Sequence, residues 1–223
     1  MSPPIVHHDA CFVVVDKPPG MIVHRGFAND DEVLVALVGK RLGERVFPVH
    51  RLDRATSGAV LFARDAVTAG RLGKAMAEGR VHKRYLALCR SHPEPEGVID
   101  HPVPKGPGRP KVPAVTRYRR LGTFERYALV ELMPITGRLH QLRRHMKHIS
   151  CPLIGDVRYG KGEHNRRFRS EYGLERLALH AYGLSFEHPT SGAEVEVKVP
   201  LSGSLKRCLE RIGLFETARA LTG

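Results

Sequence analysis

One aspartate of this chain has the setting of a catalytic group. Asp53 lies in the string His-Arg-Leu-Asp-Arg, and Thr56-Ser57-Gly58 follows it. Neighbouring arginines favour the ionised form of a carboxylate, which can then act as a nucleophile or as the anchor of a salt bridge. An ordinary turn, with Asp53 paired to a surface arginine, accounts for the same residues. The segment alone leaves both interpretations open.

The residues around Asp53 predict how it is positioned. Apolar runs at 46–49 and 59–62 flank the polar loop, and such runs are typical of strands. Functional side chains are often carried by loops between rigid elements. We therefore expect Asp53 to lie in a loop between two strands.

Composition points to a polyanionic partner. The 223 residues include 36 Lys and Arg against 23 Asp and Glu, a net charge of +13, and 42% are hydrophobic, enough for a core. A folded chain this basic favours nucleic acid, whereas no long apolar run favours a membrane. The N-terminal residues show no signal peptide, so we expect a cytoplasmic protein.

No metal site is expected. The four cysteines are scattered, with neither metal-ligand spacing nor a disulfide framework. His140, His145 and His148 do not share one helix face cleanly, and neighbouring arginines would repel a dication. The string 155–161 resembles the start of a phosphate-binding loop, but Gly162 stands where a Ser or Thr would bind magnesium, and no helix-forming run is evident after it.

The pattern of apolar residues predicts a mixture of strands and helices. Strands are expected at 11–17, 59–64, 81–89, 114–121, 127–133 and 194–199, and helices at 31–42, 65–78, 139–149 and 202–212. Asn29-Asp30 and Asp65 are candidate N-caps, and Gly43 and Gly79 candidate stops. This mixture argues for an α+β fold. With no internal repeat and no boundary, we expect one domain over 1–223.

Two basic segments are candidate RNA contacts. The helix at 139–149 has an apolar stripe, made of Leu139, Leu142, Met146 and Ile149. Its polar faces carry His140, Arg144, Lys147 and His148. The Pro- and Gly-rich segment 92–113 is expected to be a mobile loop that contacts phosphates through Lys105, Arg109 and Lys111.

The order of several short motifs resembles the RluA family of pseudouridine synthases along nearly the whole chain. The motifs are Asp16-Lys17-Pro18-Pro19-Gly20, His50-Arg51-Leu52-Asp53, Lys83-Arg84-Tyr85, Thr136-Gly137-Arg138-Leu139-His140-Gln141-Leu142-Arg143, Pro152-Leu153-Ile154-Gly155-Asp156 and Leu179-His180-Ala181. Each string is weak by itself. Their shared order and spacing make the signal specific.

The resemblance implies a pseudouridine synthase fold, with a mixed, mostly antiparallel central sheet and an active cleft across its middle. It implies that Asp53 is the nucleophile that attacks a uridine at the base or the ribose, and that Arg138 pairs with it. Tyr85 would stack on the uracil and take the late proton, and Leu142 would pack beneath the ring. Arg51 would fill the gap left by the flipped-out uridine. The motifs also place His50, Lys83 and Arg143 among the substrate-binding residues.

The resemblance also implies the substrate. The short N-terminal part and the charged segment 164–174 are similar to the branch of the family that modifies tRNA at position 65. No cofactor is expected, and we expect a monomer. Two alternatives stay open: a synthase that acts on ribosomal RNA, and a non-catalytic RNA-binding module for which the basic surface alone would suffice.

Overall fold

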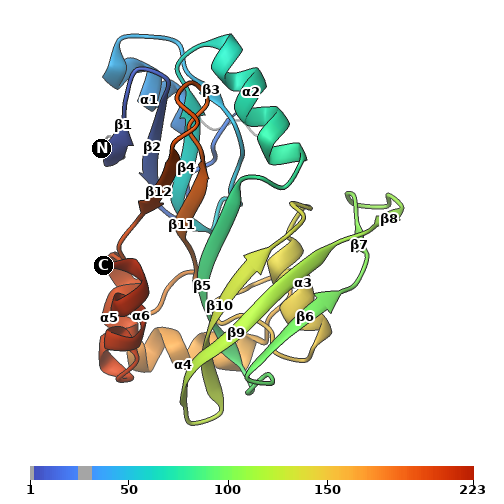
Figure 1. Cartoon of the computed structure of the whole chain (residues 1–223). Helices are drawn as coiled ribbons and strands as arrows, with labels where there is room; N and C mark the ends of the chain where they lie inside the picture. The colour runs from blue at the N-terminus through green and yellow to red at the C-terminus, as the bar shows by residue number, and fades with distance from the viewer. Residues whose placement is uncertain (1–2, 25–31) are drawn as a thin grey trace. The chain divides into compact units, whose positions relative to one another are not determined.

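The computed structural model describes residues 3–24 and 32–223. These residues fall into two units, coloured along the chain in Figure 1. Unit 1 comprises the described residues of 1–82 together with 181–199, and unit 2 comprises 83–180 and 200–223. The chain passes from one unit to the other within β5 (His82–Arg90), within β11 (Leu179–Glu187) and again after Val199. The single domain expected over 1–223 stays a prediction.

Unit 1 contains a sheet and the helices α1 and α2. In spatial order its strands are β1 (Ile5–His8), β2 (Phe12–Lys17), β4 (Ser57–Ala63) and β11, with β3 (Phe47–Pro48) on β4 and β12 (Glu194–Lys198) on β11. β2 pairs antiparallel with both β1 and β4. Every residue of β4 is buried, which explains its continuous apolar run.

The helices of unit 1 end where their cap residues predict. α2 (Ala66–Ala77) begins at Asp65, whose carboxylate accepts the Thr68 N–H at 2.8 Å, so the predicted cap is confirmed. α1 (Leu34–Leu42) ends at Gly43, which has a φ of 70°. The expected start of this helix at residue 31 and its caps at 29–30 lie outside the described residues.

Unit 2 contains the strands β5, β10 (Tyr127–Pro134), β9 (Val115–Phe124) and β6 (Glu96–Asp100), in that spatial order. All three neighbouring pairs are antiparallel. A small hairpin joins β7 (Val103–Pro104) to β8 (Lys111–Val112). The described helices are α3 (Gln141–His148), α4 (Gly162–Tyr172), α5 (Gly203–Arg211) and α6 (Phe215–Thr222).

The segment 92–113 is not the long irregular loop that its composition predicts. It contains β6, which pairs with β9, and the hairpin of β7 and β8. Ile99 and Val103 are buried, 3% and 1% exposed. The few apolar residues of this segment are enough for regular structure to form, because β6 pairs with the long strand β9.

The region after residue 160 is also more regular than predicted. α4 begins at Gly162, so the statement that no helix follows the Gly155–Gly160 string is wrong. Gly162 still lacks the hydroxyl that a magnesium-binding phosphate loop requires. Of the two arguments against a phosphate-binding loop, only the missing hydroxyl at Gly162 remains.

The buried face of α3 differs from the predicted apolar stripe. Leu139 precedes the helix and is 36% exposed, and Ile149 follows it. Three of the five buried side chains of the helix are polar, those of Gln141, Arg143 and His145. The two apolar ones are the predicted Leu142 and Met146. The polar groups on this buried face must therefore be hydrogen-bonded, because apolar contacts alone cannot satisfy them.

The α+β class and the mostly antiparallel strands are confirmed. The strands β1 and β11 and the helix α6 were not predicted. Within residues 3–24 and 32–223, no helix has the length and apolar composition needed to span a membrane.

Candidate active site

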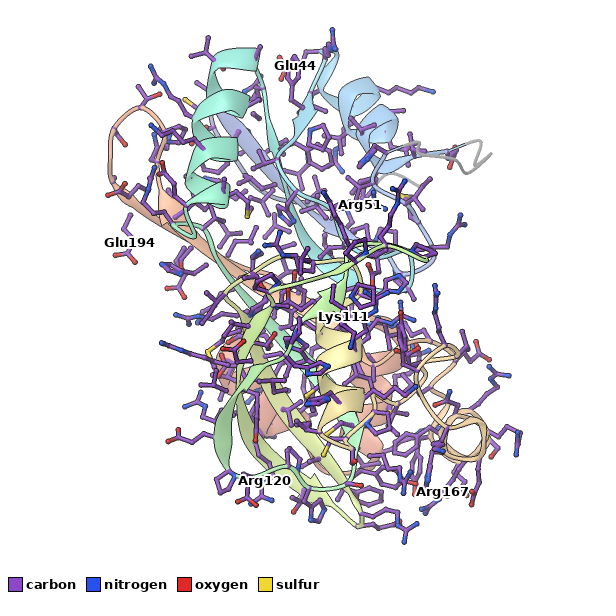
Figure 2. The ribbon with its side chains drawn as sticks, turned by 90° about the vertical axis from the view of Figure 1, so that its right-hand side faces the viewer. Glu44, Arg51, Lys111, Arg120, Arg167 and Glu194 are labelled. Atoms are coloured by element: carbon purple, nitrogen blue, oxygen red, sulfur yellow. The ribbon has the colours of Figure 1, made fainter. Side chains whose placement is uncertain are left out.

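Asp53 lies in the loop between β3 and β4, as the flanking apolar runs predict. Its side chain is half-buried, Leu52 is buried in the core, and Arg51 and Arg54 are exposed (Arg51 is labelled in Figure 2). The Thr56 N–H donates to the Asp53 carbonyl at 3.0 Å and closes a turn at the aspartate. This bond fixes the backbone that carries the carboxylate.

A buried lysine ties the Asp53 loop to β2. Lys17 is 0% exposed, and its ammonium donates to the carbonyls of Pro18 and Met21 at 2.8 Å and of Arg54 at 3.2 Å. The Gly20 N–H donates to the same Arg54 carbonyl at 2.7 Å. A buried ammonium needs such acceptors, so Lys17 holds the residue after Asp53 in one place.

His50 and Gly58 attach the two ends of the loop to strands. The Nε2 atom of His50 accepts the Leu61 N–H at 3.1 Å, so the neutral ring carries its proton on Nδ1. Gly58 has a φ of +110°, and a Cβ at this position would lie 2.1 Å from the Ala181 carbonyl oxygen. Only glycine allows this approach of β4 to β11. His50 thus has a structural bond, and its role in substrate binding stays a prediction.

Lys83, Tyr85 and Leu142 lie in unit 2. Tyr85 on β5 and Leu142 on α3 are each 7% exposed. Burial lowers the pKa of the Lys83 ammonium. Its Nζ atom lies 3.5 Å from the place that a Cβ on Gly137 would occupy. Lys83 therefore lies against the turn that carries Arg138.

Gln141 holds the backbone of that turn. Its Oε1 atom accepts the Thr136 hydroxyl at 2.7 Å and the Arg138 N–H at 3.0 Å. Its Nε2 atom donates to the Val115 carbonyl and to the Thr116 hydroxyl oxygen, both at 3.0 Å. Each polar hydrogen of the buried amide thus has an acceptor on β9, and its oxygen has two donors on the turn.

His145 continues the same network. Its Nε2 atom lies 2.9 Å from the His101 carbonyl, which can only accept, so this nitrogen carries the proton. Its Nδ1 atom then accepts the Thr116 hydroxyl at 2.9 Å. Burial lowers the pKa of His145, in agreement with a neutral ring. Both ring nitrogens are used, which leaves none for a metal.

Arg143 points inward, onto a buried carboxylate. Its Nε and Nη2 atoms donate to the two oxygens of Asp156 at 2.8 and 2.9 Å. The carboxylate also accepts the N–H groups of Arg158 and Tyr159. Burial disfavours the charged form of Asp156, but these hydrogen bonds outweigh it, and the pKa is lowered. The predicted contact of Arg143 with substrate stays a prediction.

The other predicted basic contacts are mostly exposed. The Arg138 guanidinium is exposed and donates through Nε to the Pro113 carbonyl at 3.2 Å. Arg144 donates to the Pro104 carbonyl at 2.7 Å and so attaches the β7–β8 hairpin to α3. Exposed ammonium and guanidinium groups are also presented by Lys105, Arg109, Lys111 (labelled in Figure 2) and Lys147.

One group of potential metal ligands comes together in the described residues: Asp9, Cys11 and His188 of unit 1. The Nδ1 atom of His188 accepts the N–H groups of Thr190 and Ser191, at 3.2 and 3.1 Å. Its Nε2 atom therefore carries the proton and donates it to Asp9 at 3.0 Å. A metal on Nε2 would move the proton to Nδ1, against two donors, so a hydrogen-bonded pair explains this group better.

The predicted site residues are divided between the units. Unit 1 carries His50, Arg51 and Asp53, and unit 2 carries Lys83, Tyr85, Arg138, Leu142 and Arg143. The pairing of Asp53 with Arg138 thus stays a prediction. Sequence reasoning assigned no role to Lys17, Gln141 or Asp156. Each is a buried polar residue inside a quoted motif, and that combination was the available signal.

Comparison with known families gives one clear match. The sequence model of the RNA pseudouridylate synthase family matches residues 11–148.

Curated relatives extend the match over most of the chain. A protein of Vibrio parahaemolyticus named tRNA pseudouridine synthase C is 36% identical over 93% of this chain and 94% of its own length. Proteins of the same name from Pasteurella multocida and Salmonella typhimurium are also 36% identical, and cover 97% and 94% of this chain. They span 97% and 89% of their own lengths in these alignments.

Solved structures agree. The human RNA pseudouridylate synthase domain containing 4 superposes with a TM-score of 0.79 at 30% identity, covering 94% of this chain and 92% of that one. The human RNA pseudouridylate synthase domain containing 1 gives a TM-score of 0.76 at 29% identity, covering 92% and 87%.

Proposed function

The chain belongs to the RNA pseudouridylate synthase family, and from that premise we propose that it converts a uridine of tRNA to pseudouridine with Asp53 as the nucleophile. The observation that carries the choice of tRNA is the extent of relatives named tRNA pseudouridine synthase C, such as those of Vibrio parahaemolyticus and Pasteurella multocida, which match 93% and 97% of the chain. The expected target is position 65. The net charge of +13 suits the polyanion, and we expect the enzyme to work in the cytoplasm.

The chemistry is an isomerisation. The bond between C1′ of the ribose and N1 of the uracil breaks, the ring turns, and a bond from C1′ to C5 forms. N1 gains one proton and C5 loses one, so the atoms balance within the nucleotide. Asp53 would attack the ribose or the base and hold the intermediate while the ring turns. Its turn, fixed by Thr56 and Lys17, supports this role because a nucleophile must be held in position.

The roles proposed for the other residues follow their surroundings. Arg138 would pair with the Asp53 carboxylate, and Gln141 holds the Arg138 backbone. Tyr85 would stack on the uracil and accept the C5 proton, and Leu142 would support the ring from below. Arg51 is exposed and long enough to enter the gap left by a flipped-out uridine.

Isosteric replacement of the nucleophile tests this proposal. Purified protein, with no cofactor added, is incubated with a tRNA transcript, and pseudouridine is mapped by chemical modification and primer extension. The wild-type protein should give one modified site, at position 65. Asp53→Asn should give none and should bind the tRNA with nearly wild-type affinity. Asp100→Asn, which neutralises an exposed carboxylate on β6, is the matched control and should remain active.

The same assay separates the alternatives. Modification of ribosomal RNA but not of tRNA would contradict the substrate. Wild-type turnover by Asp53→Asn would contradict the nucleophile. Arg138→Ala should lower kcat by about 10²-fold or more, the loss typical of removing one electrostatic partner of a reacting group. A kcat within twofold of wild type would contradict the pairing of Arg138 with Asp53.

A further inference from the structure

Tyr159, which follows β10 and α3 in unit 2, is a half-buried tyrosine surrounded by cationic groups. The distances from its ring centroid are 5.1 Å for Arg143, 5.6 Å for Arg158, 5.8 Å for Arg144 and 5.9 Å for Lys147. A single cation over an aromatic ring is common in proteins, whereas four around one ring concentrate charge.

Only one of these cations has an acidic partner in the described part of the chain. Arg143 is paired with Asp156. Arg144 donates instead to neutral oxygens, those of the Tyr159 hydroxyl and of the Pro104 and Leu139 carbonyls. The remaining positive charges repel one another across the ring, and a bound anion would relieve that repulsion.

The tyrosine is held so that the cations keep their places. Its hydroxyl accepts from Nε of Arg144 at 3.0 Å and lies 3.1 Å from Nδ1 of His140. The Tyr159 N–H donates to Asp156, as does that of Arg158. His140 has a φ of 53°, a conformation that few side chains adopt without cause. The buried Asp156 and the left-handed backbone of His140 thus support a ring near which Lys147 and Arg158 are exposed cations.

We propose that Arg144, Lys147 and Arg158, arranged around Tyr159, bind neighbouring backbone phosphates of the RNA strand that carries the target uridine. The inference rests on the proposed function. Guanidinium forks suit phosphate oxygens, and the charge of the cluster suits no neutral ligand. His140, which contacts Tyr159, is only two residues from Arg138, so these phosphates would lie close to the residue proposed to act on the reacting nucleotide. The motif comparison singled out neither Tyr159 nor Arg158.

Salt dependence of tRNA binding tests the phosphate contact. Affinity for a tRNA transcript is measured by fluorescence anisotropy between 50 and 200 mM salt for wild type, Lys147→Ala and Arg158→Ala. Each lost phosphate contact should lower the slope of log K against log salt by about 0.9. Over this fourfold range of salt, the wild type should therefore lose about 3.5-fold more affinity than either variant.

Two further variants separate charge from position. Tyr159→Phe keeps every charge and the ring but removes the hydroxyl that holds Arg144 and His140. It should lower affinity and raise KM severalfold while the salt slope and kcat stay near wild type. Lys206→Ala is the matched control, because Lys206 also lies over a ring, that of Phe215 at 5.1 Å, but as a single cation near Glu210. Its slope should not change.

Each outcome decides the proposal. Unchanged slopes for Lys147→Ala and Arg158→Ala would overturn it, and so would an equal fall in slope for Lys206→Ala, which would mean diffuse attraction only. Pseudouridine formation by the wild type is measured on the same tRNA. An active enzyme with unchanged slopes would refute the phosphate site alone. Reduced slopes in a protein that makes no pseudouridine from any RNA would refute the function and leave the phosphate site standing.

Discussion

Removing one partner of the ion pair between Arg143 and Asp156 should strongly destabilise unit 2. The pair joins α3 to the segment after residue 153, and the two side chains are only 9% and 0% exposed. Asp156→Asn keeps the shape and removes the charge. Arg143→Met keeps much of the aliphatic length and removes the donors. In either variant, the surviving partner stays buried without its counter-charge.

The size of the effect follows from that burial. Breaking a buried pair by removing one member costs about 3–5 kcal/mol, because the remaining ion has lost its water and its partner. For a chain of this length about 1 kcal/mol corresponds to 2–4 °C, so Tm should fall by roughly 6–20 °C. The double variant should cost less than the sum of the single variants, with a coupling of about 2–3 kcal/mol.

Urea unfolding followed by circular dichroism measures these differences, and pH adds a second test. The pKa of Asp156 is lowered in the folded chain from its ordinary 3.8. Its ionised form therefore stabilises the fold fully above that value, and the contribution is lost as pH falls below it toward the folded pKa. The gap between wild type and Asp156→Asn should shrink there. Single variants that each cost under about 1 kcal/mol and add in the double variant would refute the reasoning.

Three other substitutions test the polar framework. Gly58→Ala should prevent unit 1 from folding normally, since its Cβ would lie 2.1 Å from the Ala181 carbonyl oxygen; a wild-type Tm would contradict this. Lys17→Met should leave buried carbonyls unsatisfied at about 1–3 kcal/mol and lower kcat more than tRNA affinity, because the turn of Asp53 loosens; the kcat-to-KM split measures it. The lowered pKa of His145 means that its contribution to stability is complete above its unfolded value of 6.5 and declines as pH falls toward the folded value. Below pH 6.5 the free energy of unfolding of the wild type should therefore fall by up to about 1.4 kcal/mol per pH unit relative to that of His145→Gln. Urea unfolding at several pH values measures both free energies, and a difference that does not change with pH would contradict a neutral His145 ring.

Local signals predicted much of the fold. The Asp65 cap predicted α2 because its carboxylate needs no distant partner to satisfy the Thr68 N–H. The apolar run at 59–62 predicted the strand β4, which the structure shows to be buried along its whole length. The mixture of expected strands and helices predicted the α+β class, and the motif order predicted the family. These features depend on a few neighbouring residues or on a preserved string.

Elements that depend on distant partners were missed. β6 forms in a segment whose composition favours irregular structure, and it exists because β9 supplies hydrogen-bond partners about twenty residues later. Gly155 has a φ of +76°, and a Cβ there would lie 2.0 Å from the Arg176 carbonyl oxygen. No window of sequence around residue 155 contains that oxygen.

The buried face of α3 shows why the pattern of apolar residues did not predict the polar residues that support the candidate site. The apolar periodicity assigned Leu139 and Ile149 to the core, whereas the structure also buries the polar residues Gln141 and Arg143. Their partners lie on β9 and at Asp156, so burial becomes favourable only after the chain has folded.

An apolar face would pack α3 at least as stably, because a satisfied buried polar network gains little over well-packed hydrophobic side chains. Hydrogen bonds, unlike apolar contacts, also fix the orientation of the groups that they join. The oxygen of Gln141 accepts both the Thr136 hydroxyl and the Arg138 N–H, so the turn has one orientation in which both bonds form. Lys17 acts similarly on the Arg54 carbonyl. Gln141 and Lys17 are therefore best understood as positioning the turns that carry the proposed catalytic residues Arg138 and Asp53. For Gln141 this explains why it lies in the same motif as Arg138.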